Sequence, residues 1–307
     1  MNPQSFGTAS RDPIIGIACA IAAVALGTVH MTLGGAPDRL IIVNLAALLI
    51  GIGLCLWLSQ SRHLKGERIA LLAPLLGTSL LATALLGLQA DGASRWISVA
   101  GLIVQPSLLF VPVLVMLHAR SGSGWTVAGL ALAIAGTAAQ PDRAMAGVLV
   151  GSLIVLALMR RERRDLWLAL GALVGFVVTV VRPDRGGISP FVDQILFSSF
   201  EVHLLVGTGL ATGVLLLVVP AAIQAMQDAD RTTGLVFGSI WSLVVIAAMM
   251  GNYPTPLVGY GGSAIIGYLL SVAFMRPASK TTAGQATPTG TVSSTTEADA
   301  CRMMPAA

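Results

Sequence analysis

Residues 40–59 read LIIVNLAALLIGIGLCLWLS, an apolar run without a charged side chain. An α-helix rises about 1.5 Å per residue, so about 20 such residues match the hydrocarbon thickness of a bilayer. Similar runs recur along the 307-residue chain, which is 55% hydrophobic and 10% charged, with a mean hydropathy of +0.83. A soluble core cannot bury this much apolar surface, so the sequence predicts an all-α, polytopic integral membrane protein.

Polar joints on either side of this run divide the chain into ten expected spans. They cover residues 13–33, 40–59, 68–88, 104–118, 124–139, 144–159, 166–182, 195–218, 233–251 and 257–275. The fourth and fifth are short, and a merged or re-entrant pair there stays open. The expected organisation is an N-terminal segment (1–12), a transmembrane domain (13–276) and a Thr-, Ser-, Ala-, Gly- and Pro-rich disordered tail (277–307).

Basic residues gather in alternate joints, which predicts the orientation because short Lys- and Arg-rich loops stay cytoplasmic. These residues are Arg62, Lys65, Arg68, Arg160, Arg161, Arg163, Arg164, Arg231, Arg276 and Lys280. Both termini are therefore expected in the cytoplasm, and the net charge of +4 reflects topology. No nucleic-acid partner is expected, because the basic run at 160–164 has no aromatic residues for base stacking. Two cysteines lie in spans and one in the tail, which suggests neither a disulfide nor a metal site.

The joints on the opposite side carry the polar groups that chemistry would need. They contain Asp91-Gly-Ala-Ser-Arg95-Trp96-Ile97, Gln105-Pro-Ser107, Gln140-Pro-Asp142-Arg143, Arg182-Pro-Asp184-Arg185, Pro190-Phe-Val-Asp193-Gln194 and Pro254-Thr-Pro256-Leu-Val-Gly-Tyr260-Gly-Gly-Ser263. Glu201 and His203 follow just inside the eighth expected span. Ionisable groups near membrane depth usually face a protein interior or a wet cavity.

Each motif also has a purely structural interpretation. Arg95 and Trp96 could anchor the interface, the proline steps could break helices, and Gly261-Gly262 could allow close packing. Asp193 could be the N-cap of the eighth span. The order and spacing of the whole set favour a functional site.

The ordered set resembles the SEDS family, which includes FtsW, RodA and SpoVE. Gly92-Ala-Ser-Arg-Trp-Ile97 and Gln105-Pro-Ser107 resemble the family's Gly-Ala-x-Arg-Trp-Ile and Gln-Pro-Ser-Glu, and Gln140-Pro-Asp142 resembles its Gln-Pro-Asp-Leu-Gly-Thr. Tyr260-Gly-Gly-Ser263 resembles the end of its Pro-Phe-x-Ser-Tyr-Gly-Gly-Ser-Ser signature. Asp193, Glu201 and Gly207 keep the family's spacing in between. The resemblance covers roughly residues 15–275 and implies ten spans in the bacterial inner (cytoplasmic) membrane, with both termini in the cytoplasm.

The chain also departs from the family pattern. Leu108 and Val111 stand where the family has an acidic residue and a Lys, and the loop before Asp193 is short. A competing alignment places Gly207-Thr-Gly-Leu-Ala-Thr-Gly213 on the family's glycine-rich segment, which would leave Asp193 unmatched. The first alignment is preferred because it needs no gap through Gly234.

The resemblance implies a peptidoglycan glycosyltransferase that polymerises a lipid-linked disaccharide precursor (lipid II) outside the membrane, in cell division or elongation. Asp193 matches the family's essential carboxylate and is the candidate catalytic base. The expected substrate-binding residues are Arg95, Trp96, Gln105, Gln140, Asp142, Glu201, Tyr260 and Ser263. Arg95 and Arg143 are candidates for the pyrophosphate. A divalent cation, Mg²⁺ or Mn²⁺, could share that charge, but isolated carboxylates define no metal ligands.

The expected partners are the lipid-linked precursor, membrane lipids and a single-span monofunctional transpeptidase (a class B penicillin-binding protein). The small residues Gly234, Gly238 and Ser239 offer a face for the transpeptidase helix. Two other classes stay open: a non-catalytic scaffold or precursor binder, favoured by Leu108 and Val111, and a lipid flippase, disfavoured because no ionisable residue lies deep in a span.

Overall fold

The computed structural model describes residues 11–61, 67–90, 92–182, 187, 189–227 and 231–275. The helices are α1 (Arg11–Leu33), α2 (Asp38–Gln60), α3 (Glu67–Ala70), α4 (Ala73–Leu86), α5 (Pro106–Ser121), α6 (Gly124–Ala139), α7 (Arg143–Arg160), α8 (Arg163–Val180), α9 (Ile195–Val202), α10 (Leu204–Leu216), α11 (Val219–Gln227), α12 (Thr232–Met250) and α13 (Gly262–Ala273). The expected tail and most of the N-terminal segment lie outside the described residues.

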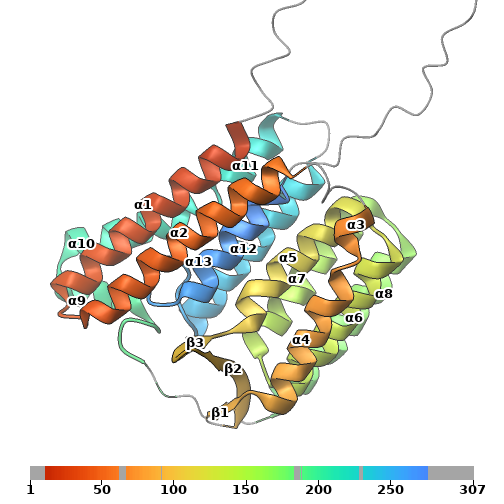
Figure 1. The fold of residues 1–307 in the computed structure, drawn as a ribbon, viewed down its shortest axis with the longest axis horizontal. Helices are drawn as coiled ribbons and strands as arrows, with labels where there is room; N and C mark the ends of the chain where they lie inside the picture. Colours follow the sequence, from red (N-terminus) through yellow and green to blue (C-terminus); the bar gives the residue numbers. More distant parts are fainter. Residues whose placement is uncertain are drawn as a thin grey trace, which may run out of the picture.

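The helices form a bundle with polar joints at its two ends (Figure 1). Within the described residues, five helical segments are long and apolar enough to cross a membrane: α1, α2, α3 with α4, α7 and α12. The pair α10 and α11, bent by 41°, counts as a sixth. Large apolar side chains such as Leu86, Leu49 and Val181 are exposed on the outside, as a lipid-facing surface requires. The predicted polytopic, all-α membrane fold is confirmed.

Glycines permit close approach at two helix crossings. A Cβ atom on Gly77 of α4 would lie 2.3 Å from the carbonyl oxygen of Gly129 on α6. A Cβ on Gly267 of α13 would lie 2.2 Å from the carbonyl oxygen of Leu108 on α5. Between helices in a membrane, where burial against lipid gives little driving force, such backbone contact supplies the packing. The second crossing brings α13 against the start of α5, beside the site described below.

A buried polar cluster joins α5, α6 and α8 at the end of the bundle away from the expected site. His118 Nε2 lies 2.8 Å from Asp165 Oδ1, and His118 Nδ1 lies 2.7 Å from Thr126 Oγ1. All three side chains are completely buried. The α5–α6 joint itself turns at Gly122, whose φ is +55°, and Ser123 caps α6. The fourth and fifth expected spans are therefore two separate helices.

The eighth expected span, 195–218, is wrong. His203 has an extended backbone and separates α9 from α10, against which α9 packs. The His203 Nδ1 atom accepts a hydrogen bond from the Leu205 N–H, so His203 caps α10. The candidate crossing segment is α10 with α11, taken as one bent span, and it begins about nine residues later than expected.

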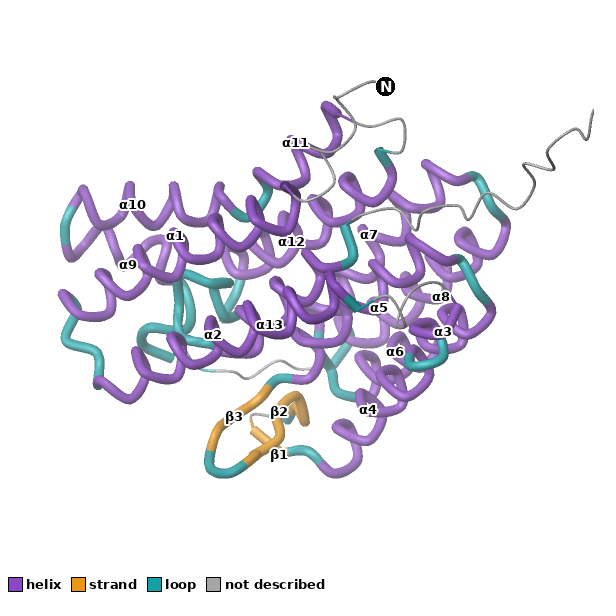
Figure 2. The backbone as a smooth tube through the Cα atoms, turned by 45° about the horizontal axis from the view of Figure 1, so that its top comes forward, coloured by secondary structure: helices purple, strands orange, loops and turns teal. Residues whose placement is uncertain are grey.

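Residues 88–104 form a small antiparallel sheet that the sequence did not predict. Its strands are β1 (Leu88–Ala90), β2 (Ala93–Val99) and β3 (Leu102–Val104), in the order β1-β2-β3. β2 and β3 are joined by Ala100 and Gly101, whose φ angles of 49° and 80° fit a two-residue hairpin turn. The sheet stands outside the helices, near the end of α4 (Figure 2). It holds residues 95 and 96 over the end of the bundle.

The small residues predicted as a docking face on α12 are partly covered by the same chain. A Cβ on Gly234 would meet the carbonyl oxygen of Ala221 and the side chain of Gln224 at 3.3 Å, and one on Gly238 would meet Ala221 Cβ at 3.0 Å. Ala221 and Gln224 belong to α11. Gly234 is therefore buried against a helix of the same chain, whereas Gly238 and Ser239 are half-buried, and the docking face stays a prediction.

Candidate functional site

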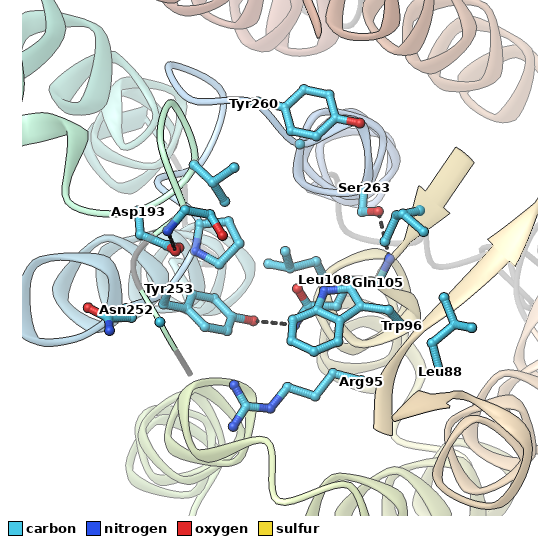
Figure 3. Close-up of a pocket in the computed structure, with 16 residues that line it drawn as sticks. Leu88, Arg95, Trp96, Gln105, Leu108, Asp193, Asn252, Tyr253, Tyr260 and Ser263 are labelled. Carbon is cyan, nitrogen blue, oxygen red and sulfur yellow. Dashed lines mark hydrogen bonds between the residues drawn. The ribbon is translucent and has the colours of Figure 1, made fainter. Parts of the chain in front are cut away.

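A cavity of about 410 Å³, here called the central cavity, lies at the end of the bundle next to the sheet (Figure 3). Segments that are far apart in the sequence converge on it: β2, the start of α5, and the loops before α9 and α13. Six of the predicted site residues line it, namely Arg95, Trp96, Gln105, Asp193, Tyr260 and Ser263. The predicted convergence is thus found for most of the set.

Asp193 is buried, with 8% of its surface exposed. Its Oδ2 atom accepts a 2.9 Å hydrogen bond from the Ser189 N–H, and its own N–H donates to the Ser189 carbonyl at 3.0 Å. Burial raises the pKa of the Asp193 carboxyl above its usual 3.8, and the bond from Ser189 offsets part of this shift. Asp193 is not an N-cap: Gln194 occupies that position of α9, without a side-chain cap.

Two loops are bonded together to place Asp193. The Thr255 N–H donates to the Val192 carbonyl at 3.0 Å, and the Tyr260 N–H donates to the Phe191 carbonyl at 2.7 Å. Phe191 and Gln194, on either side of Asp193, have φ angles of 62° and 55°. Such left-handed residues are costly unless the surroundings hold them, and they cluster at functional sites. The Asp193 loop is therefore a constrained element of the cavity wall.

A buried polar network forms the opposite wall. The Ser107 hydroxyl donates to Asp142 Oδ2 at 2.6 Å, and the Gln105 amide nitrogen lies 3.3 Å from the same oxygen. Gln105 also donates to the Tyr253 hydroxyl at 3.0 Å, while its backbone N–H donates to Ser263 Oγ at 2.9 Å. Asp142 Oδ1 accepts from the Met145 N–H and so caps α7. Asp142 and Ser107 hold this wall and do not line the cavity.

Arg95 lies between the sheet and the bundle. Its guanidinium donates to the Pro141 carbonyl at 2.8 Å, and its central carbon lies 5.9 Å from the centre of the Trp96 ring. In Figure 3, Tyr253 lies between the Arg95 and Asp193 side chains. The cavity therefore presents a carboxylate and a guanidinium fork on its two sides, with an aromatic ring and hydroxyls between them.

Asp193 and Glu201 line a second space of about 510 Å³, here called the side cavity, together with His30, Phe191 and Phe197. Glu201 is exposed and belongs to α9. Glu201 therefore shares a cavity with Asp193, but this cavity is not the one that Arg95 lines.

Besides Asp142 and Glu201, two more of the predicted residues do not line the central cavity. Gln140 is fully buried, and its amide donates to the Leu80 carbonyl inside α4. Arg143 donates to the Thr179 and Val180 carbonyls at 3.2 and 3.3 Å and so caps the end of α8. Neither residue lines the central cavity. Gln140 therefore joins α4 to the α6–α7 joint, because both partners are buried between these helices.

The sequence reasoning missed Tyr253 and Asn44. Burial and the nearby Asp142 carboxylate raise the pKa of the Tyr253 phenol well above 10, so it is a neutral hydroxyl. The Asn44 side chain, buried on α2, donates to the Gly259 carbonyl at 2.9 Å and accepts from the Gly261 N–H at 3.1 Å. It thus pins the loop before α13. A polar residue inside an otherwise apolar run was the available signal for Asn44.

The donor set does not by itself define a metal site. Within the described residues, no group of three His, Cys, Asp or Glu side chains gathers in a metal-binding arrangement. Among the described residues that line the central cavity, Asp193 is the one carboxylate. Mg²⁺ is commonly held by one or two carboxylates together with substrate phosphates, so this chain alone gives no basis for a step through a metal ion.

The geometry defines a polytopic, all-helical membrane protein with a polar cavity at one end. Its fold is that of RodA: the chain is similar to the rod shape determining protein RodA of Thermus thermophilus, with a TM-score of 0.60, 23% identity, and coverage of 85% of this chain and 94% of RodA. An aspartate-to-alanine mutant of that protein matches with a TM-score of 0.58 and 23% identity. A chain of a peptidoglycan synthase complex that coordinates polymerization and crosslinking matches with a TM-score of 0.57 and 20% identity. The match covers 85% of this chain and 95% of that chain. No family model and no curated protein matches the sequence.

Proposed function

We propose that this chain is a divergent SEDS protein of cell-wall assembly and that it polymerises lipid-linked disaccharide on the outer side of the bacterial inner membrane. The observation that carries the proposal is the convergence of Arg95, Trp96, Gln105, Tyr260 and Ser263 around Asp193 in one cavity. These residues belong to the motifs that resemble the SEDS family. Residues with a shared chemical role are expected to line the same cavity.

In the proposed reaction, Asp193 is the general base. It removes the proton from the acceptor sugar hydroxyl as that oxygen bonds to the anomeric carbon of the donor, and the bond from that carbon to the lipid diphosphate breaks. Its pKa, raised by burial, makes the carboxylate a stronger base than an exposed aspartate. Arg95 is placed to compensate the charge on the departing diphosphate, and Trp96 and Tyr260 supply surfaces for the sugars.

The test is glycan polymerisation by the purified full-length chain with lipid-linked disaccharide, alone and with a single-span transpeptidase. Polymer formed by the wild type, and lost in Asp193→Asn, supports the proposal. Binding of the precursor without polymer in either format would assign the chain to non-catalytic binders. Leu108, which lines the cavity where the family has an acidic residue, would then account for the lost reaction.

The orientation has its own test. Arg164 lies in the first turn of α8, next to the α7–α8 joint, and Ser189 lies in the loop before α9. The α7–α8 joint and the start of α9 lie at opposite ends of the bundle (Figure 1). A cysteine at Ser189 is expected to react with a membrane-impermeant thiol reagent from outside, and one at Arg164 only from the cytoplasm. Equal labelling of both from outside would contradict the proposed topology.

A further inference from the structure

Two arginine side chains meet over the α5–α6 joint, at the end of the bundle away from the central cavity (Figure 1). Arg160, at the end of α7, donates to the His118 carbonyl at 3.1 Å and to the Ala119 carbonyl. Arg164, in the first turn of α8, donates to the Gly122 carbonyl. A Cβ atom on Gly122 would lie 3.1 Å from Arg160 Nη1 and 2.8 Å from Arg164 Nη2. The two guanidinium groups are therefore held side by side.

Two further arginines lie between these residues in the sequence. The whole group is here called the arginine joint and consists of Arg160, Arg161, Arg163 and Arg164. Glu162 forms a surface ion pair with Arg164. Arg161 and Arg163 are exposed and pair with no described carboxylate. Because guanidinium groups stay protonated in proteins, the arginine joint carries a net positive charge that the described residues do not neutralise.

The helix dipole makes this charge unfavourable at the start of α8. The N-terminus of a helix carries a partial positive charge, which favours Asp or Glu in the first turn and disfavours Arg. Arg163 and Arg164 occupy that turn, and Glu162 at the N-cap makes no side-chain cap hydrogen bond. Asp165, the acidic residue of the turn, is fully buried and bonded to His118. An anion at this surface would stabilise both the arginines and the start of the helix.

Exposed tryptophans indicate that this end of the bundle lies at a membrane surface. Trp57 lies in the last turn of α2, Trp125 in the first turn of α6 and Trp167 in the second turn of α8, and all three are exposed. Tryptophan is enriched where hydrocarbon meets lipid headgroups, because its ring is apolar and its N–H is polar. The arginine joint adjoins the start of α8 and is therefore expected at the level of the headgroup phosphates.

Arg163 stands at the head of an apolar face of α8. Positions 163, 166, 167 and 170 follow the spacing of a single helix face. Beyond Arg163, this face consists of Leu166, Trp167, Leu170 and Val174, which are exposed large apolar side chains, and it is here called the α8 face. In a membrane such a face contacts hydrocarbon. A molecule that lies along the α8 face therefore meets the arginine joint at its polar end.

We infer that the arginine joint binds the phosphate of an anionic phospholipid whose acyl chains lie along the α8 face. The headgroup supplies the missing negative charge, and guanidinium groups form paired hydrogen bonds with phosphate oxygens. A zwitterionic headgroup presents its own cation to the arginines, so charge selects against it. In the proposed orientation the bound lipid belongs to the cytoplasmic leaflet. The site is independent of glycan polymerisation.

The experiment measures phospholipid binding to the purified full-length chain by native mass spectrometry, with phosphatidylglycerol and phosphatidylcholine of identical acyl chains. We expect phosphatidylglycerol to bind the wild type at least about tenfold more tightly. Arg163→Gln should weaken phosphatidylglycerol about fivefold, and adding Arg161→Asn should bring the loss to about 20-fold. Asn suits position 161 because the backbone there has a φ of 57°. Equal affinity of the wild type for both lipids would overturn the inference.

The matched control is Arg68→Gln. Arg68 is exposed on α3, and its replacement removes the same charge from the same end of the bundle. Its affinity for phosphatidylglycerol should equal that of the wild type. An equal loss in Arg68→Gln and Arg163→Gln would show that only the overall charge of this surface attracts lipid, which would overturn the site. Thermal unfolding in detergent checks that each variant is folded, and Arg163→Gln carries the test if the double variant is not.

Competing ligands and a change in the α8 face distinguish a lipid from a free anion. Inorganic phosphate and glycerol 3-phosphate lack acyl chains, so each should displace phosphatidylglycerol only at concentrations at least about 100-fold above that of the lipid. Trp167→Ala should weaken both phospholipids, because it removes part of the apolar face, whereas Arg163→Gln should spare phosphatidylcholine. Displacement by inorganic phosphate at the concentration of the lipid would assign the arginine joint to free anions and overturn the inference.

Discussion

Two aspartates lie at the same end of the bundle and have opposite surroundings. Asp142 is fully buried and accepts hydrogen bonds from Ser107, Gln105 and the Met145 N–H. Asp193 accepts one from the Ser189 N–H and lines both the central and the side cavity. The carboxylate with many protein donors stabilises the wall, and the carboxylate that faces open volume is available to a substrate. Burial alone therefore does not distinguish a structural from a reactive carboxylate.

The largest expected effect separates the two aspartates by activity. Asp193→Asn keeps the size of the side chain and removes the base, so polymerisation should fall about 100-fold to 10,000-fold. Folding should change little, which thermal unfolding in detergent checks. Asp38→Asn, at an exposed aspartate at the start of α2, is the control. Unchanged polymerisation by Asp193→Asn would mean that Asp193 is not the base.

Asp142→Ala should act on stability instead. It removes the cap of α7, worth about 1 kcal/mol, and leaves the buried Ser107 hydroxyl without its acceptor, at about 1–3 kcal/mol. We expect an unfolding free energy lower by about 2–4 kcal/mol, seen as a lower apparent melting temperature. Asp38→Ala should leave that temperature unchanged. A variant at position 142 with wild-type stability would show that the network does not hold the wall.

Arg95 tests the cationic side of the cavity. Arg95→Ala removes a charge-assisted contact worth about 1.5–3 kcal/mol, or roughly 10-fold to 150-fold in precursor binding. Arg95→Lys should restore binding only in part, because an ammonium group replaces a planar fork. Binding isotherms with lipid-linked disaccharide measure both variants, and Arg68→Ala, exposed on α3, is the control. Full recovery by Lys would show that charge alone is needed.

The pH dependence sharpens the contrast further. Because burial raises the pKa of Asp193 above 3.8, the acidic limb of the rate profile should lie above that value and fall about tenfold per pH unit. At a pH between the pKa of Asp193 in the unfolded chain and its higher pKa in the folded protein, the folded protein holds the proton and the unfolded chain does not. The contribution of Asp193 to stability is therefore present at low pH and lost as pH rises through the folded pKa. Activity and stability measured on the same samples should thus change in opposite directions across this interval.

The smallest expected effect is at Tyr253. Tyr253→Phe removes one hydrogen bond to Gln105, which still has Ser107 and Asp142 as partners. The unfolding free energy should fall by about 0.5–1.5 kcal/mol. Phe237→Leu, in the aromatic core with Tyr268, is expected to cost more, and the pair can be compared in one denaturation series. A larger loss for Tyr253→Phe than for Asp142→Ala would contradict the assigned roles.

Most of the helices could be predicted, because a membrane helix is determined mainly by the length of its own apolar run and by the charges that flank it. The second span was expected at 40–59 and is α2 at Asp38–Gln60, and the fifth matches α6 at Gly124–Ala139. The prediction of the eighth span failed because residues 195–218 are mostly apolar, and the break at His203 depends on packing of α9 against α10. The sheet was not predicted, because strands of three to seven residues beside a Gly turn resemble an ordinary loop in the sequence.

Residues of the cavity that belong to a sequence motif could be predicted. Residues that reach the cavity only through the folding of distant segments could not. Trp96 and Ser263 line the cavity as expected, but Gln140 and Asp142 occupy equally polar positions and are used for packing. Which oxygen faces a cavity depends on helix rotation, which spacing along the chain does not give. Asn44 and Tyr253 lie in segments without a motif, so only the fold brings them to the site.

The two loops that hold Asp193 give the reaction centre a mechanical property. The Asp193 loop is bonded to residues 255 and 260, which follow α12, whereas Arg95 is carried by the sheet next to α4. α12 packs against α5, α7 and α11. A tilt of α12 relative to α4 therefore changes the separation of base and cation without altering either residue. If Asp193 and Arg95 act as proposed, a membrane helix that packed on α12 and tilted it would alter the proposed polymerisation without contacting either residue.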